Sequence, residues 1–263
     1  MAIGIFDSGI GGLTAVKELE KIYPDADFVY FGDTARIPYG TRGIDVINKY
    51  SLQDCRFLIS HNVEAILVAC CTVSSNSLPL LKSAFDVPIF GVVEPAVKKA
   101  VAVANSGNGI VAVLGTGATV KSNSFANAIH AIDPKLTVIS KSCPLFVPLV
   151  ENGHTSPNDP ISIAAANEYL KDILPKNPSA VILGCTHYPL LIPVISQFLK
   201  DSILINCAFE AVSDVLGISS FAKNGSNKKF FVSDNTEDFC RIACSFIGRD
   251  ITGNVKETDI ESY

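Results

Sequence analysis

Two short stretches of the sequence, AILVACCT at residues 65–72 and AVILGCT at residues 180–186, follow the same pattern. Each is an unbroken apolar run that ends in a small residue, cysteine and threonine, with a second cysteine in the first stretch. Apolar runs of about five residues without polar alternation are typical of strands buried on both faces of a parallel sheet. The repetition predicts two similar units, each made of a strand, a cysteine-containing turn and a helix.

Short apolar runs alternate with longer amphipathic segments along the rest of the chain, which predicts an α/β protein with helices on both faces of parallel sheets. The repeated pattern of strand, cysteine-containing turn and helix favours two separate sheets over one wide sheet. The Gly- and Asn-rich segment NSGNG, residues 105–109, is the expected crossing between them. The polar tail, residues 249–263, is expected to be loosely held. Strands are predicted at residues 2–6, 27–31, 65–69, 88–91, 110–114, 136–139, 180–183, 203–205 and 229–232, and helices, among others, at 13–22, 44–60, 94–104, 159–174 and 190–199.

Composition excludes several classes of function. The 263 residues are 48% apolar and 18% charged, with a net charge of −5, and the densest basic spot, KNGSNKK at residues 223–229, is interpreted as a solvated loop. A nucleic-acid partner is therefore disfavoured. No apolar run approaches the length of a membrane span, and the start MAIGIFDSG does not resemble a signal peptide. We expect a cytoplasmic protein whose eight cysteines stay reduced and whose cysteine spacings indicate no metal site.

Glycine-rich segments and polar or reactive side chains follow the predicted strands, at the strand ends where open α/β sheets bind their ligands. They occur in DSGIGG (7–12), GDTARIPYG (32–40), the segment 70–72, GTGAT (115–119) and the segment 185–187. These loops offer hydroxyls and backbone N–H groups at helix starts, which favours a small ligand with carboxylates. The glycines of DSGIGG miss the dinucleotide fingerprint, and GTGATVKS lacks the glycine that a P-loop has before its lysine.

Two of the cysteines are candidate acid–base groups. A cysteine at a strand end is usually a small buried hydrophobic residue. Cys70 and Cys185, however, each precede a predicted helix, and a helix N-terminus lowers the pKa of a thiol. Asp7 and His187 are expected at the same carboxyl ends of the strands as these two cysteines. One activated thiol would indicate a hydrolase or transferase. Two thiols facing one cleft predict that one removes a proton from a carbon and the other returns one to the opposite face, which is a racemisation or epimerisation.

Seven motifs resemble those of the glutamate racemases, within the cofactor-independent aspartate/glutamate racemase superfamily. The resemblance covers nearly the whole chain, and GCTHYP and GDTARIPYG are its most specific parts. It implies two doubly wound parallel-sheet domains related by pseudo-twofold symmetry, with the active site between them. The expected domains are residues 1–95 plus 210–263, and residues 96–209. The motifs are FDSGIGGLT, FGDTARIPYG, LVACCT, GVVEPA, LGTGAT, LVENG and GCTHYPLL.

The resemblance also implies roles for single residues. Cys70 matches the catalytic thiol on the D-glutamate side and Cys185 the one on the L side, while Asp7, His187 and Glu151 match the assisting residues. Asp7 could alternatively cap the first helix. The expected substrate contacts are Asp7, Ser8, Pro38, Tyr39, Gly40, Cys71, Thr72, Thr116, Thr119, Thr186 and His187.

One position departs from the family pattern. The family motif is Ala-Cys-Asn-Thr, whereas this chain has Cys71 where the substrate-binding asparagine is expected. A thiol is a weaker hydrogen-bonding group than an amide. The extra cysteine also leaves two alignments open, since matching the threonines pairs Cys71 with Cys185, and matching the strands pairs Cys70 with Cys185. We prefer the strand alignment, because the strand fixes the direction of the side chain.

The implied reaction is interconversion of L- and D-glutamate by two thiols without a cofactor, supplying D-glutamate for peptidoglycan. No lysine occurs in the motifs, which disfavours a pyridoxal-phosphate Schiff base. The expected partners are the small-molecule substrate glutamate and a second copy of the chain in a homodimer, with neither nucleic acid nor membrane. Two rivals remain, namely an aspartate or broad-specificity amino-acid racemase, and a binding protein that has lost the chemistry.

Overall fold

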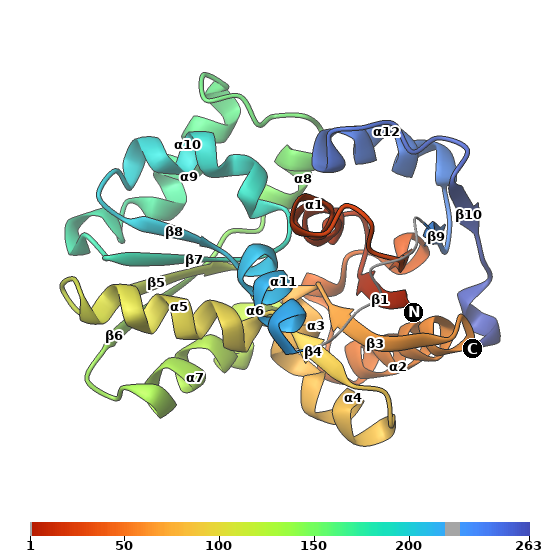
Figure 1. The fold of residues 1–263 in the computed structure, drawn as a ribbon. Coiled ribbons are helices and arrows are strands. Elements are labelled where there is room, and N and C mark those ends of the chain that lie inside the picture. Colours follow the sequence, from red (N-terminus) through yellow and green to blue (C-terminus); the bar gives the residue numbers. More distant parts are fainter. Residues whose placement is uncertain (1, 219–226) are drawn as a thin grey trace.

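The computed structural model describes residues 2–218 and 227–263, which form two parallel sheets flanked by helices (Figure 1). The strand order is β10-β9-β2-β1-β3-β4 in the six-stranded sheet and β6-β5-β7-β8 in the four-stranded sheet. We call the two sheets and their helices the first and second lobes. The strands are β1 Ala2–Asp7, β2 Phe28–Gly32, β3 Val63–Val68, β4 Ile89–Gly91, β5 Ile110–Gly115, β6 Thr137–Ser142, β7 Ala180–Gly184, β8 Ile203–Asn206, β9 Lys228–Val232 and β10 Val255–Glu257.

Helices cover both faces of the sheets, so the predicted α/β class is confirmed. The α-helices are α1 Leu13–Ile22, α2 Ile44–Ser60, α3 Cys71–Asn76, α4 Leu78–Ala84, α5 Val93–Asn105, α6 Gly117–Ser122, α7 Ser124–Ile132, α8 Phe146–Glu151, α9 Pro160–Leu170, α10 Ile192–Phe198, α11 Cys207–Ile218 and α12 Thr236–Ile247. Short 3-10 turns are η1 Thr34–Arg36, η2 Tyr39–Thr41, η3 Leu174–Lys176, η4 Tyr188–Leu191 and η5 Ile260–Ser262.

The two apolar runs that opened the sequence analysis form interior strands. β3 pairs in parallel with β1 and β4, and β7 pairs in parallel with β5 and β8. Every residue of β7 is buried, as are all residues of β3 except Glu64. Burial on both faces explains the unbroken apolar pattern, because a strand covered by helices on both sides has no face for polar residues.

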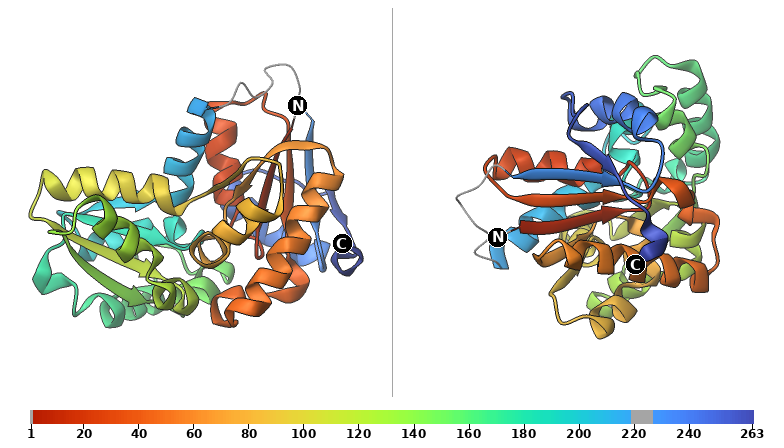
Figure 2. Two further views of the ribbon diagram at one scale, coloured as in Figure 1. Left: turned by 90° about the horizontal axis from the view of Figure 1, so that it is seen from below. Right: turned by 90° about the vertical axis from the view of Figure 1, so that its right-hand side faces the viewer.

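The two lobes lie side by side, with α5 and α11 near their junction (Figures 1 and 2). α5 packs on β5, β7 and β8 of the second lobe, so the chain has already left the first sheet after β4. The crossing predicted at residues 105–109 is therefore wrong. That segment is the turn between α5 and β5, where Gly109 has a φ of +75°. Gly and Asn mark a turn, but they do not indicate whether the chain changes sheet there. The expected domain boundaries stay a prediction.

The polar tail is ordered, which corrects the expectation of a loosely held end. β10 pairs in parallel with β9, and Ile260 is buried. A strand of only three residues with one apolar side chain has no periodicity to reveal it, so its pairing was not visible in the sequence.

No helix within residues 2–218 and 227–263 is both long and apolar enough to cross a membrane. Residues 223–226 of the KNGSNKK segment lie outside the described residues.

The interior of β7 provides a test of the core. Leu183 is fully buried, so Leu183→Ala should lower the free energy of unfolding by about 2–5 kcal/mol through lost burial and a residual cavity. Leu80→Ala removes the same atoms from a side chain that is 37% exposed, and should lower it by less than about 1 kcal/mol. Urea denaturation of the two variants measures both values, and equal losses would contradict this placement of the core.

Candidate active site

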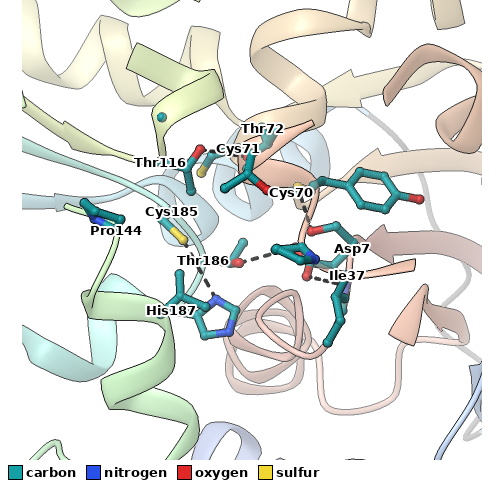
Figure 3. A pocket seen from close by; sticks show the side chains of 18 of the residues that line it. Asp7, Ile37, Cys70, Cys71, Thr72, Thr116, Pro144, Cys185, Thr186 and His187 are labelled. Atoms are coloured by element: carbon teal, nitrogen blue, oxygen red, sulfur yellow. Dashed lines mark hydrogen bonds between the residues drawn. The ribbon is translucent and has the colours of Figure 1, made fainter. Parts of the chain in front are cut away.

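The polar loops of both lobes meet around one cavity of about 360 Å³ (Figure 3). This volume is within the usual range of small-molecule sites. The loops follow the carboxyl ends of β1, β2, β3, β5 and β7, where parallel sheets bind their ligands. The lining residues are Asp7, Ser8, Gly9, Ile37, Pro38, Tyr39, Gly40, Thr41, Cys70, Cys71, Thr72, Thr116, Gly117, Pro144, Val147, Pro148, Glu151, Cys185, Thr186, His187 and Tyr188.

All the predicted site residues except Thr119 line this cavity. Thr119 is buried behind the wall, where its hydroxyl lies 3.0 Å from that of Thr116. Thr116 caps α6 by accepting a hydrogen bond from the Thr119 N–H, and its hydroxyl is 3.0 Å from that of Thr72 in the first lobe. Thr119 therefore supports Thr116 and Thr72 from behind through its hydrogen bonds.

The first thiol lies in an acidic corner of the cavity. Cys70 lies two positions after the end of β3 and is the N-cap residue of α3, and its Sγ lies 3.3 Å from the Ser8 hydroxyl. Burial, together with the nearby Asp7 carboxylate, raises the pKa of Cys70 to about 12. The expectation of a lowered pKa at this helix start is wrong for the net shift, because burial and Asp7 outweigh the lowering effect of the Val73 N–H in the first turn of α3.

The second thiol lies beside a histidine. Cys185 Sγ is 3.8 Å from His187 Nδ1, and His187 Nε2 is 2.9 Å from Glu151 Oε1. Burial alone would lower the pKa of His187, but its hydrogen bonds with Cys185 and Glu151 raise that pKa to about 10. The imidazole is therefore protonated at neutral pH, and a positive charge faces the Cys185 sulfur. Glu151, the last residue of α8, is brought to the site by the second lobe.

Asp7 links the two lobes across the cavity. Its carboxylate accepts hydrogen bonds from the Gly9 N–H at 3.0 Å and from the Thr186 hydroxyl at 3.3 Å. Asp7 is the last residue of β1 and does not occupy the N-cap position of α1, which is Gly12, but its carboxylate is hydrogen-bonded to the Gly12 N–H at that helix start. Burial raises the pKa of Asp7, while the charge of His187 opposes that rise.

The loop after β1 touches the loop after β7 through a glycine. A Cβ on Gly11 would lie 2.1 Å from Thr186 Oγ1 and 2.6 Å from His187 Nδ1. Only a residue without a side chain fits between these atoms. Gly11 of DSGIGG therefore serves the close packing between the lobes, whereas a Cβ on Gly9 or Gly12 would meet only residues of the first lobe.

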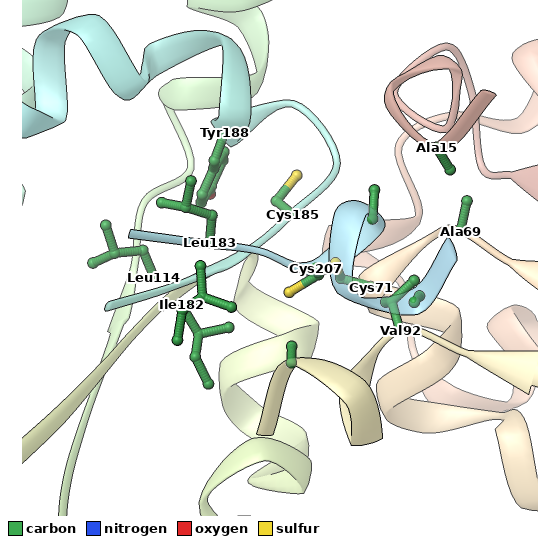
Figure 4. Packing of buried hydrophobic residues seen from close by; sticks show 14 of the residues in the cluster. Ala15, Ala69, Cys71, Val92, Leu114, Ile182, Leu183, Cys185, Tyr188 and Cys207 are labelled. Atoms are coloured by element: carbon green, nitrogen blue, oxygen red, sulfur yellow. The ribbon is translucent and has the colours of Figure 1, made fainter. Parts of the chain in front are cut away.

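Cys71 lines the cavity but lies among apolar side chains and beside Cys207 (Figure 4). It is only 2% exposed, and the neighbouring Cys207 thiol and burial raise the pKa of Cys71 well above its usual range. Cys70, in contrast, has Ser8 as a polar partner. These surroundings favour Cys70 over Cys71 as the acid–base thiol of the first lobe.

Sequence reasoning missed the apolar part of the lining. Pro144, Val147 and Pro148 come from the segment CPLFVPL, which begins one position after β6. Its position after a strand and its two prolines were available signals, but apolar residues are common everywhere in a core. Phe246 of α12 was also missed; its ring lies edge-on to His187, with 5.3 Å between centroids.

Comparison with known proteins places this site in a family. A family model described as Asp/Glu/Hydantoin racemase matches residues 14–212. The chain belongs to that family. As a member, it is an isomerase. It is 39% identical to a glutamate racemase of Geobacter metallireducens, with 99% of this chain and 97% of the relative covered. It is 42% identical to a glutamate racemase of Aquifex pyrophilus, with 95% of each chain covered.

Solved structures agree with this membership. A glutamate racemase from Francisella tularensis in complex with D-glutamate is 34% identical and superposes with a TM-score of 0.90, covering 100% of this chain and 98% of the other. The Thermus thermophilus glutamate racemase in complex with β-chloro-D-alanine is 37% identical, with a TM-score of 0.87 and the same coverage. The two-domain fold expected from the racemase resemblance is confirmed.

Gly11 allows a test of the contact between the lobes. In this racemase-family chain, Gly11→Ala should lower kcat/KM by at least about 100-fold, because the added methyl group displaces Thr186 and His187. Gly43→Ala is the matched control, since a Cβ there meets nothing within 4 Å. Racemase assays and melting temperatures of both variants are the measurements. Full activity of a folded Gly11→Ala protein would show that the close contact is not needed.

The raised pKa of His187 predicts a pH-dependent stability. The folded-state value of about 10 is above the ordinary 6.5, so the protonated ring contributes stability that is fully present below about pH 6.5 and is lost as the pH rises through about 10. Urea unfolding of the wild type and of His187→Asn, from about pH 6 to about pH 11, measures the difference in stability. The wild-type advantage should shrink toward the alkaline end, and a constant advantage would contradict a charged ring.

Proposed function

We propose that this protein is a glutamate racemase that interconverts L- and D-glutamate by a two-thiol proton transfer and needs no cofactor. The observation that carries the proposal is the presence of Cys70 and Cys185 in the wall of one cavity, each from a different lobe. The glutamate racemases that match along the whole chain support the choice of glutamate.

The two-thiol scheme needs one thiol and one thiolate at the start of each turnover. The pKa of Cys70, about 12, makes it a thiol at neutral pH. In the two-thiol scheme Cys185, whose sulfur lies 3.8 Å from His187 Nδ1, is then the thiolate that removes the first proton. A protein in this state reacts first with L-glutamate, since Cys185 is the thiol expected on the L side.

The proton transfers balance as follows. The Cys185 thiolate takes the α-proton of L-glutamate and becomes a thiol, and the electron pair stays on the α-carbon and its carboxylate. The Cys70 thiol then gives its proton to the opposite face of that carbon, which yields D-glutamate and leaves a Cys70 thiolate. The reverse sequence starts from this second state. Glu151 holds the His187 ring, and Asp7 influences the proton affinity of Cys70.

Most of the groups available to bind the substrate are neutral hydrogen-bond donors. The described lining contains hydroxyls of Ser8, Thr72, Thr116 and Thr186 together with backbone N–H groups of the loops, and it contains no Lys or Arg. Hydroxyl and amide donors bind carboxylates, and His187 supplies positive charge. Cys71, which takes the place of the expected asparagine, should weaken binding by about 0.5–1.5 kcal/mol where water replaces the lost contact.

The proposal also includes a metabolic role, a cellular location and an oligomeric state, all of which follow from the resemblance. D-Glutamate produced by this protein would supply peptidoglycan synthesis. The protein would act in the cytoplasm, and it would form a homodimer.

The first experiment is incubation of the purified, reduced protein with L-glutamate in D2O without added cofactor. Optical rotation and the α-proton NMR signal should both disappear, because each turnover replaces the α-proton by solvent deuterium. Retention of both signals by folded protein would contradict the proposal. Loss of signal with aspartate but not with glutamate would favour the rival substrate, and glutamate binding without exchange would favour a binding protein.

Serine variants test the two thiols. Cys70→Ser and Cys185→Ser should each lower kcat by at least about 100-fold, because a hydroxyl is a far weaker acid than a thiol. Cys71→Ser should keep most of the activity, and Cys244→Ser, at an exposed thiol, is the control. Full activity in the Cys70→Ser/Cys185→Ser double variant would overturn the mechanism. Loss of activity in Cys71→Ser with retention in Cys70→Ser would transfer the role to Cys71.

A further inference from the structure

One wall of the cavity depends on side chains for its position. Residues 37–41, which we call the lip, all line the cavity. The lip belongs to no strand or α-helix and contains only the short turn η2. On its inner side it meets the second lobe, since a Cβ on Gly40 would lie 2.8 Å from Thr116 Cβ. What holds the lip from behind therefore affects the shape of the cavity.

A buried arginine lies directly behind the lip. Arg36 is 8% exposed, and its Nε lies 2.7 Å from Asp33 Oδ2 and its Nη2 lies 3.0 Å from Asp54 Oδ1. The hydroxyl of Tyr39, a lip residue, donates to the same two carboxylates. The Arg36 guanidinium also stacks on the Tyr50 ring, 4.2 Å from its centroid. Arg36 and Tyr39 thus share their partners, so the orientation of one constrains the other.

The end of the chain completes this cluster. Glu261, in η5, accepts a hydrogen bond from Arg36 Nη1 at 3.2 Å, and the same Nη1 donates to Gln53 Oε1 at 2.7 Å. Residues 259–263, which we call the strap, are fixed on both sides of Glu261. Ile260 is buried, and the Tyr263 ring packs edge-on against Phe57 of α2 with 5.2 Å between centroids.

The buried charges around Arg36 explain why its solvent-facing partner, Glu261, affects the cluster. Asp33 and Asp54 are both fully buried and face a single guanidinium, and burial together with the charge of Asp33 raises the pKa of Asp54 well above its usual range. A planar guanidinium with a partner for each edge is held in one orientation. Loss of one partner leaves an N–H group without an acceptor and allows the whole guanidinium to shift toward water. Glu261, whose side chain is 59% exposed, is the partner that faces solvent.

We propose that Glu261 is a positioning residue, through which the strap holds Arg36, Tyr39 and the lip in the conformation that binds substrate. This inference rests on the proposed function, since it concerns the affinity of the same cavity. It predicts an effect on substrate binding from a residue that does not line the cavity.

The decisive comparison is Glu261→Gln against Glu257→Gln. Glu257 lies in β10, is exposed and has no ion pair among the described residues, so its variant makes the same change of charge nearby without touching Arg36. Glu261→Gln should raise the KM for glutamate about threefold with kcat changed less than about twofold, in keeping with the strength of a half-exposed ion pair. Amide hydrogen exchange in residues 37–43, read by mass spectrometry, should become faster. Glu257→Gln should leave both unchanged.

Two further variants separate positioning from stability alone. Glu261→Asp should restore part of the wild-type KM, because a carboxylate remains near Arg36. Removal of residues 259–263 should raise KM further and speed exchange in the lip. Unchanged KM and unchanged lip exchange in Glu261→Gln would overturn the proposal. So would a fall in kcat that follows a lower melting temperature while KM stays constant.

The exchange measurement does not depend on activity. A wild-type protein inactive on glutamate would contradict the proposed function, and the lip exchange of Glu261→Gln would still decide whether the strap holds the lip. Faster exchange in residues 37–43, with unchanged exchange in α9 of the second lobe, which contributes no residue to the cavity, would support the coupling.

Discussion

The close contact between the loop after β1 and the loop after β7 determines the arrangement of the site. Gly11 leaves space for Thr186 and His187, and the Thr186 hydroxyl reaches Asp7 across the junction of the lobes. If these loops stood further apart, the two thiols would line separate surfaces. The polar groups of the two lobes therefore face one cavity only because a glycine lets the other lobe approach. Thr72 and Thr116 make a second bridge on the far side of the cavity.

The sequence was sufficient for the main strands and for most of the polar site. Apolar runs without alternation predict buried parallel strands, and residues after such strands must gather at one edge of a sheet. This reasoning predicts Asp7, Cys70, Cys185 and His187 as site residues from the sequence alone. It failed where local pattern carries no information about distant contacts. The pairing of β10 with β9, the burial of Ile260 and the contact of Phe246 with His187 all depend on residues that are not neighbours in the sequence.

The pKa of Cys70 shows a second limit of sequence reasoning. A helix start beside Cys70 indicates a lowered pKa, but the pKa is raised because the side chain is buried beside Asp7. Burial and neighbouring charge are properties of the assembled site. The difference between Cys70 and Cys71 is of the same kind, since adjacent cysteines in one motif have a polar partner in one case and an apolar setting in the other.

The two thiols occupy unlike surroundings, with a carboxylate near Cys70 and an imidazole near Cys185. Mirror-image amino acids have the same free energy in water, so no arrangement of side chains can make a racemase favour one of them at equilibrium. Thermodynamics then requires the same catalytic efficiency in both directions, however unequal the two sides of the site are. The asymmetry can change only how this efficiency is divided between affinity and turnover. An enantiomer held more tightly must be converted more slowly once the site is saturated.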